Sequence, residues 1–285
     1  MSESQSCTAS FVPLVPALIA SAVRLSEQAG WNQLAGDWER TLRLAPEGVK
    51  VWTDETGEVR ASYSVIGYGR RVAWIGMILV DTAWRGKGLG KLAFAGALED
   101  ARAAGYAVLG LDATDLGEPI YRKFGFAVCR PIARWGGILR SAAAPEGTPE
   151  IREGFSPELA KLDRDVCGED RSLVLADLAD HGGRLIRLEE DGRTEAYAGI
   201  RPGRNAFHLG PVVARSGDAA GRILDAAARV LGGRKVFADV FEMGSAAFAA
   251  RGLEPMRQLQ RMTLPLERDC LCRDGVWCAA GFELG

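Results

Sequence analysis

The segment from Val80 to Lys91 places a glycine-rich loop between a predicted strand and a predicted helix. Three glycines at alternate positions, Gly86, Gly88 and Gly90, allow the main chain to adopt left-handed dihedrals and to approach a ligand closely. Unpaired N–H groups in the first turn of a helix bind anions, and the helix dipole strengthens that binding. The segment therefore predicts an α/β fold with an anion-binding turn at a strand–helix junction.

The spacing of the glycines excludes two other phosphate-binding loops. A nucleoside-triphosphate loop requires G-x-x-x-x-G-K followed by Ser or Thr, which this segment lacks. A dinucleotide-binding loop requires a third glycine three residues after the second, and Lys91 occupies that position. The formal net charge of −2 gives the chain no basic field of the kind that holds nucleic acid, so no nucleic-acid partner is expected.

The residue pattern around the loop predicts a mixed sheet with helices. Residues 11–44 are predicted to be mostly helical, and a helix follows the loop to about residue 104, with apolar side chains at helical spacing. A short helix is expected at 119–124. Strands are predicted at 50–52, 59–66, 71–80, 107–111 and 132–139.

This order of elements repeats in the second half of the chain. Strands are predicted at 185–188, 194–200, 207–213, 235–241 and up to residue 262, with helices at 217–231 and 245–250. The small, proline-containing stretch 141–150 is predicted to be a linker. We therefore expect two similar domains, residues 1–143 and 144–285. The tail at 275–282 is expected to add an edge strand.

Two motifs together resemble a known family. R-x-x-G-x-G follows a strand ending in Val, and Y-x-x-x-G-F follows downstream; this pair resembles the GNAT superfamily of acetyltransferases. The matching residues are Arg85, Gly88, Gly90, Tyr121, Gly125 and Phe126. The resemblance covers about residues 49–135, and the repeated halves are similar to a tandem subgroup with an active N-terminal GNAT domain and a degenerate C-terminal copy.

The resemblance implies acetyl-CoA as the cosubstrate. The loop amides of residues 86–91 would bind its pyrophosphate, and the strand before the loop would splay at a bulge and pair with the pantetheine arm. Thr114 stands where the family often has Asn, and its hydroxyl can also bond a pantetheine amide. The implied cofactor-binding residues are Ile78, Leu79, Val80, Arg85, Gly86, Lys87, Gly88, Leu89, Gly90, Lys91 and Thr114.

Acyl transfer to an amine requires an oxyanion donor, a proton for the leaving thiolate and a neutral amine. Backbone amides at the end of the 71–80 strand are candidates for the oxyanion donor. Tyr121 is the candidate acid, or else a core residue with a satisfied hydroxyl. Asp112 either acts on the acceptor as a catalytic or substrate-binding carboxylate or caps the following turn, and Asp81 is a second, turn-like candidate.

Trp31 and Asn32 are candidate acceptor-binding residues, because the loop between the first two helices commonly covers the acceptor in this superfamily. The alternative for Trp31 is a core anchor at the end of a helix. In the second half, residues 214–221 lack the G-x-G core, Asp218 stands where an anion would bind, and Phe248 replaces the tyrosine. The second half is therefore not expected to bind CoA.

The predicted function is an acetyl-CoA-dependent N-acetyltransferase that acts on a primary amine of a small molecule, such as an amino sugar, antibiotic-like amine, amino acid or polyamine. The alternatives are a protein or peptide N-acetyltransferase and a non-catalytic acyl-CoA-binding regulatory module.

The cysteines do not form a pattern that predicts a metal site. Cys270, Cys272 and Cys278 are spaced C-x-C-x5-C, but a zinc site needs a fourth ligand, and His181 and His208 are the only histidines. No metal is expected, and free thiols favour a reducing cytoplasm. No segment reads as a membrane span, so no membrane partner is expected. The protein is expected to be a monomer or homodimer.

Overall fold

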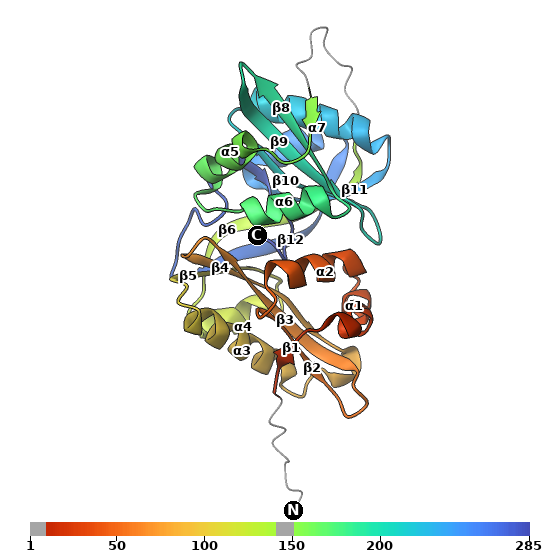
Figure 1. Ribbon diagram of the computed structural model, residues 1–285, viewed down its shortest axis with the longest axis vertical. Coiled ribbons are helices and arrows are strands. Elements are labelled where there is room, and N and C mark those ends of the chain that lie inside the picture. The colour runs from red at the N-terminus through yellow and green to blue at the C-terminus, as the bar shows by residue number, and fades with distance from the viewer. Residues whose placement is uncertain (1–9, 141–150) are drawn as a thin grey trace, which may run out of the picture.

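The computed structural model describes residues 10–140 and 151–285. Figure 1 shows the two halves of the chain one above the other along the long axis. The predicted linker at 141–150 and the predicted domain boundary at 143/144 lie outside the described residues. None of the helices within the described ranges combines the length and the apolar character that crossing a membrane requires.

The first half follows the predicted order of elements, with boundaries a few residues away from the predicted ones. Its elements are β1 (Val12–Pro13), η1 (Pro16–Leu18), α1 (Ile19–Gln28), α2 (Ala35–Leu44), β2 (Val49–Thr53), β3 (Val59–Tyr68), β4 (Val72–Val80), η2 (Thr82–Trp84), α3 (Leu89–Ala103), β5 (Val108–Ala113), α4 (Glu118–Lys123) and β6 (Ala127–Ile138).

The second half repeats this order, and it also contains β7 and two helices, α5 and α6, that the sequence pattern does not predict. Its elements are β7 (Ile151–Glu153), α5 (Pro157–Cys167), α6 (Ser172–Asp180), β8 (Arg184–Glu190), β9 (Arg193–Arg201), β10 (Phe207–Ala214), α7 (Gly217–Leu231), β11 (Lys235–Phe241), η3 (Glu242–Gly244), α8 (Ser245–Ala249), β12 (Leu253–Leu264) and β13 (Val276–Cys278).

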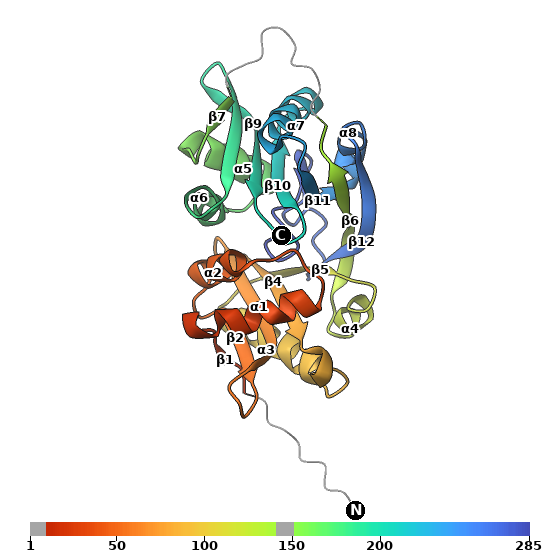
Figure 2. The ribbon, with the colours of Figure 1, turned by 90° about the vertical axis from the view of Figure 1, so that its right-hand side faces the viewer.

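The two halves share one sheet because they exchange strands. In the described residues the sheet has 13 strands in the order β1-β2-β3-β4-β5-β12-β6-β11-β13-β10-β9-β8-β7. Strand β12 of the second half pairs with β5 of the first, and β6 of the first half pairs with β11 of the second. Figure 2 shows the long strands β6 and β12 running together along one flank. Each half therefore depends on the other for its last strand.

Helices cover both faces of the first half of the sheet. Helix α3 packs Phe94, Ala97 and neighbouring apolar side chains against β3 and β4, as the helical spacing predicts. On the opposite face, α1 and α2 bury Ala22 and Trp38 in a cluster that includes Met77 of β4. Strand β4 is thus held firmly from both sides, which fixes the position of its C-terminal end.

The prediction that the tail adds an edge strand is wrong. Strand β13 lies inside the sheet, between β10 and β11, and pairs antiparallel with both. Its residues Val276 and Cys278 are fully buried. The physical reason is that β10 and β11 diverge, which leaves unpaired main-chain groups between them, and buried groups of this kind require hydrogen-bond partners.

Candidate active site

Strands β4 and β5 are parallel and separate after a short paired stretch. Their register covers only Val72–Trp74 of β4 against Val108–Gly110 of β5. Beyond this point β4 carries a bulge, where Met77 has a positive φ of 49° and the β3–β4 register shifts. Ser62 Oγ donates a hydrogen bond to the Met77 carbonyl at 2.7 Å and so anchors the bulge. The predicted splay is confirmed, and it exposes the β5-facing edge of β4.

The glycine loop connects the end of β4 to α3, as predicted. Gly86 and Gly88 have φ values of 77° and 87°, which only glycine adopts without strain, and a Cβ on either would meet no atom within 4 Å. The first helical amide with an acceptor is that of Leu92, which donates to the Gly88 carbonyl at 3.1 Å. In the described chain the amides of residues 86–91 have no acceptor, so they are available to an anion.

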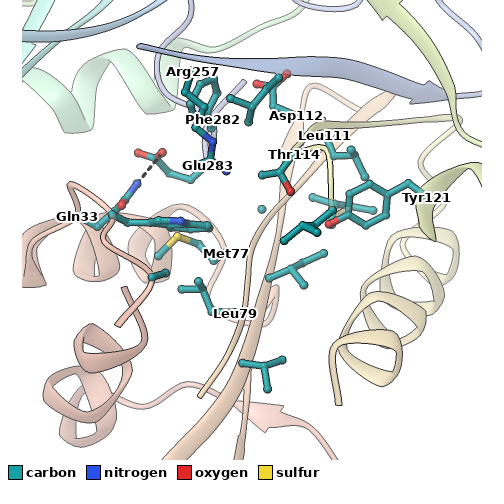
Figure 3. Close-up of a pocket in the computed structure, with 18 of the residues that line it drawn as sticks. Gln33, Met77, Leu79, Leu111, Asp112, Thr114, Tyr121, Arg257, Phe282 and Glu283 are labelled. Carbon is teal, nitrogen blue, oxygen red and sulfur yellow. Dashed lines mark hydrogen bonds between the residues drawn. The ribbon is translucent and has the colours of Figure 1, made fainter. Parts of the chain in front are cut away.

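A cavity of about 420 Å³ opens between the splayed strands and continues under the second half. Figure 3 shows the side chains that converge on it from both halves of the chain. Its lining residues are Gln28, Ala29, Trp31, Gln33, Ile75, Gly76, Met77, Ile78, Leu79, Val80, Arg85, Leu111, Asp112, Thr114, Leu116, Tyr121, Arg134, Arg257, Leu259, Phe282 and Glu283. One end therefore lies at the predicted cofactor loop, and the other is lined by second-half residues.

Tyr121 lines this cavity from α4. Its ring lies 4.5 Å from that of Phe94 between centroids, and a Cβ at Gly117 would lie 2.8 Å from its Cε2 atom. The glycine thus leaves room for the ring. Burial raises the pKa of Tyr121 to about 12, so the hydroxyl carries its proton at neutral pH and can donate it. Thr114 also lines the cavity, and its Oγ1 accepts a hydrogen bond from the Gly117 amide at 3.2 Å.

Asp112 lines the cavity, but Arg261 of β12 binds both of its carboxylate oxygens. Arg261 donates from Nε at 2.9 Å and from Nη2 at 2.8 Å, and both side chains are wholly buried. The Arg261 guanidinium also lies 4.4 Å from the Trp74 ring centroid. Burial raises the pKa of Asp112, and the neighbouring Arg261 acts against that increase. The catalytic role of Asp112 stays a prediction that this geometry does not favour.

The other predicted polar residues occupy different places. Trp31 lines the cavity, whereas Asn32 lies outside it and holds the second half: its Nδ2 donates to the Ala206 carbonyl at 3.0 Å. Asp81 accepts hydrogen bonds from the Ala83 amide at 2.9 Å and from Arg60 at 2.8 Å. Although burial opposes it, these bonds lower the pKa of Asp81, so this carboxylate is a turn residue rather than a base.

Gln33, Glu283 and Arg257 are polar cavity residues that were not predicted from the sequence. Gln33 directly follows the predicted Trp31–Asn32 pair, and its Nε2 donates to Glu283 Oε2 at 3.0 Å. Glu283 and Arg257 come from the second half. The position next to Trp31 and Asn32 is a signal that could have identified Gln33. No local pattern marks Glu283 or Arg257, because their nearness to the cavity results from the strand exchange.

In the second half, β10 and β11 diverge as β4 and β5 do, but here another strand of the chain fills the gap. Strands β10 and β11 pair in parallel only at Phe207–Val236 and His208–Phe237. Past this point β13 lies between them. At the start of α7, Ser216 Oγ accepts a hydrogen bond from the Ala219 amide at 3.1 Å, and Asp218 stands in the first turn. The space that is open in the first half is therefore filled by β13 here, and the Ala219 amide has an internal partner.

The cysteines of the described residues are free thiols. No group of three or more His, Cys, Asp or Glu side chains in this part of the chain is arranged to hold a metal ion.

Comparison with known protein families gives a separate match for each half of the chain. Two family models, both described as "Acetyltransferase (GNAT) domain", match residues 42–140 and 159–268. A curated relative, named holothin acyltransferase, from Pseudoalteromonas sp. (strain SANK 73390), is 30% identical over 186 residues, which is 64% of this chain and 61% of that relative. The chain thus spans about 61% of the length of that relative.

Solved structures show the same fold over the whole chain. A Pyrococcus horikoshii protein designated an acetyltransferase superposes with a TM-score of 0.84 at 22% identity, covering 100% of this chain and 99% of its own. A tandem GNAT protein from the clavulanic acid biosynthesis pathway gives a TM-score of 0.66 at 19% identity, covering 89% of this chain and 97% of its own. These two structures support the fold alone. The matched domains and the splayed strands with their glycine loop lead to one conclusion: the chain belongs to the GNAT acetyltransferases, which use acyl-CoA, and it carries two GNAT domains in tandem.

Proposed function

We propose that this protein transfers an acetyl group from acetyl-CoA to a primary amine of a small molecule. One observation carries the proposal: the open edge of β4, Arg85 and the protonated Tyr121 line one cavity, and the acceptor-free amides of residues 86–91 directly follow Arg85 along the chain. The loop fits a diphosphate, the edge of β4 fits an amide-containing arm, and Tyr121 stands where that arm would end. This combination supports acyl transfer from a CoA thioester.

In the proposed mechanism, the chain's own groups act on an amine that attacks the thioester carbonyl. Main-chain N–H groups at the bulge of β4, next to Met77, stabilise the oxyanion as the C–N bond forms. Tyr121 donates its proton to the sulfur as the C–S bond breaks. The proton lost from the amine leaves through water. The same water then returns a proton to the tyrosinate.

The lining of the cavity by residues of both halves supports a small acceptor over a polypeptide. Leu259, Phe282 and Glu283 of the second half line the cavity together with Trp31 of the first. The relative named holothin acyltransferase is consistent with a small-molecule acceptor. A protein or peptide acceptor and a non-catalytic acyl-CoA-binding module remain the competing functions, and the experiment below separates them from the proposal.

The proposed function is tested by following thiol release from acetyl-CoA in the presence of small amines and, separately, of peptides with free amino groups. Turnover with small amines supports the proposal. Turnover with peptides alone favours the protein acetyltransferase. Calorimetric binding of acetyl-CoA without turnover on any acceptor favours the regulatory module.

The loop predicts a specific effect of valine at position 88. Gly88→Val forces a β-branched residue to a φ of 87°, which costs about 1–2 kcal/mol and distorts the amide cradle, so the Kd for acetyl-CoA rises about tenfold. Isothermal titration calorimetry measures this change. Gly57→Val is the matched control, because Gly57 has a φ of 80° in a hairpin turn outside the cavity. Equal Kd values for wild type and Gly88→Val contradict the assigned loop.

We further propose that the second half binds no acyl-CoA, as its altered loop predicts. Strand β13 occupies the space between β10 and β11, and Ser216 caps the Ala219 amide in the first turn of α7. Calorimetric titration is therefore expected to find a single acetyl-CoA site per chain. A second site that persists in the Gly88→Val variant contradicts this assignment.

The proposed setting is the cytoplasm, in agreement with the free thiols of the described residues. The proposed form is a monomer or homodimer with no nucleic-acid or membrane partner.

A further inference from the structure

Gln33, at the end of the cavity that the second half lines, has a buried carbonyl oxygen without a hydrogen-bond donor among the described residues. Gln33 is 6% exposed, and its Oε1 has no partner in the described structure. Its Nε2 donates to Glu283 Oε2, which fixes the amide orientation, because the reverse orientation would set two oxygens against each other. Buried polar atoms are nearly always satisfied, so this oxygen needs a donor from outside the described chain.

Gln33 and its partner Glu283 lie next to the proposed reaction centre. Glu283 passes directly against β4: a Cβ on Gly76 would lie 3.0 Å from the Glu283 carbonyl oxygen. Gln33 and Glu283 therefore lie beside the bulge at which the thioester is proposed to react. Glu283 is also bound by Arg201 at 2.7 Å, which leaves lone pairs on its oxygens for a further N–H group.

All but one of the charged side chains that line the cavity have a hydrogen-bond or ion-pair partner among the described residues; Arg85 Nε donates to the Val80 carbonyl at 3.3 Å. Asp112 is paired with Arg261, Arg134 with Asp239 at 2.8 Å, and Glu283 with Arg201. Arg257 of β12 is exposed, lines the same cavity, and its guanidinium has no hydrogen-bond or ion-pair partner among the described residues. In Figure 3, Gln33, Glu283 and Arg257 lie on the side of the cavity opposite Tyr121.

We propose that the acceptor is a zwitterion whose amine is held by Gln33 Oε1 and Glu283 and whose anionic group is held by Arg257. A guanidinium binds carboxylates through two parallel N–H donors, and this geometry favours a carboxylate on the acceptor. The rings of Trp31 and Phe282 line the space between and favour an apolar or aromatic body. This inference rests on the proposed function and narrows it to amines of the amino-acid type.

The test compares amines that differ only by a carboxylate: phenylalanine with phenethylamine, tyrosine with tyramine, and histidine with histamine. With the full-length protein and saturating acetyl-CoA, the carboxylated member of a pair is expected to have the higher kcat/KM, by about 10- to 100-fold. Arg257→Gln is expected to bring this ratio close to one, and Arg257→Lys to retain part of it. Arg229→Gln makes the same charge change on the exposed surface of α7 and leaves the ratio unchanged.

Gln33→Met removes the unpartnered oxygen with little change in shape. It is expected to raise the KM of both members of a pair, because both carry the amine, without raising the KM of acetyl-CoA. If the KM of acetyl-CoA rises in parallel with the KM of the amines, the amine-binding role of Gln33 is overturned, since a general structural defect would affect both substrates.

The outcomes separate this inference from the proposed function. If amines are acetylated but the pairs show no preference, or Arg257→Gln preserves it, the zwitterion inference is overturned and the acetyltransferase stands. If no amine is acetylated, the proposed function fails, and calorimetric titration of the acetyl-CoA-loaded protein with phenylalanine decides the inference. Phenylalanine binding that is weaker in Arg257→Gln than in the wild type supports the zwitterion inference. No binding, or equal binding by the two proteins, overturns it.

Discussion

Tyr121→Phe is expected to lower kcat by about 10²- to 10⁴-fold, the usual contribution of a positioned proton donor. The change removes only the hydroxyl, because the ring keeps its packing against Phe94 and its room above Gly117. The Kd for acetyl-CoA is therefore expected to stay at the wild-type value. Single-turnover rates with saturating acetyl-CoA, together with calorimetry, measure the two quantities separately.

The pH profile gives a second readout for Tyr121. Burial raises its pKa to about 12, and a phenol loses its proton only as the pH rises through its pKa. The rate should therefore show no basic limb from this residue in the neutral and mildly alkaline range. Tyr63→Phe is the matched control, because the Tyr63 hydroxyl donates to Asp100 at 2.8 Å away from the cavity. An unchanged kcat in Tyr121→Phe removes the residue from the mechanism.

Asp112→Ala is expected to lower the free energy of unfolding by about 3–5 kcal/mol, because it leaves a buried guanidinium without its counter-charge. Arg261 would stay enclosed between the rings of Trp74 and Phe241 with only the Leu271 carbonyl as acceptor. The pair joins β5 of the first half to β12 of the second, so the loss weakens the junction of the two halves. Urea denaturation measures the change.

The control for this prediction is an exposed ion pair on α5. Lys161 and Asp165 are paired at 2.8 Å, with side chains 73% and 42% exposed, and Lys161→Ala should cost no more than about 0.5 kcal/mol. Replacing both buried partners by apolar residues, Asp112→Ala with Arg261→Met, should recover part of the lost stability. An Asp112→Ala protein as stable as the wild type would show that the pair is not a structural element and would restore Asp112 as a candidate base.

Local features of the site were predictable from the sequence. The strand, loop and helix around Gly86, Gly88 and Gly90 follow from residues that are neighbours along the chain, since dihedral preference and apolar spacing are local properties. Tyr121 could be identified in the same way, from the short motif in which it stands. The repeated order of elements likewise predicted the two GNAT domains, although α5 and α6 were missed.

Long-range features were decided by the tertiary structure alone. The tail pattern is the same for an edge strand and an internal one, and only the gap between β10 and β11 placed β13 inside the sheet. Asp112 has the same local sequence whether it is a base or a structural partner, and only the structure shows that Arg261 pairs with it from across the chain, which favours the structural role.

The sequence by itself therefore determined most of the element order, the glycine-rich turn between β4 and α3 and the place of Tyr121 on a short helix, because each depends on short stretches of chain. The tertiary structure decided which residues line the far end of the cavity, among them Gln33, Glu283 and Arg257. These residues come together only when β6 and β12 cross between the halves, and that exchange minimises unpaired strand edges over the whole sheet rather than in any one segment.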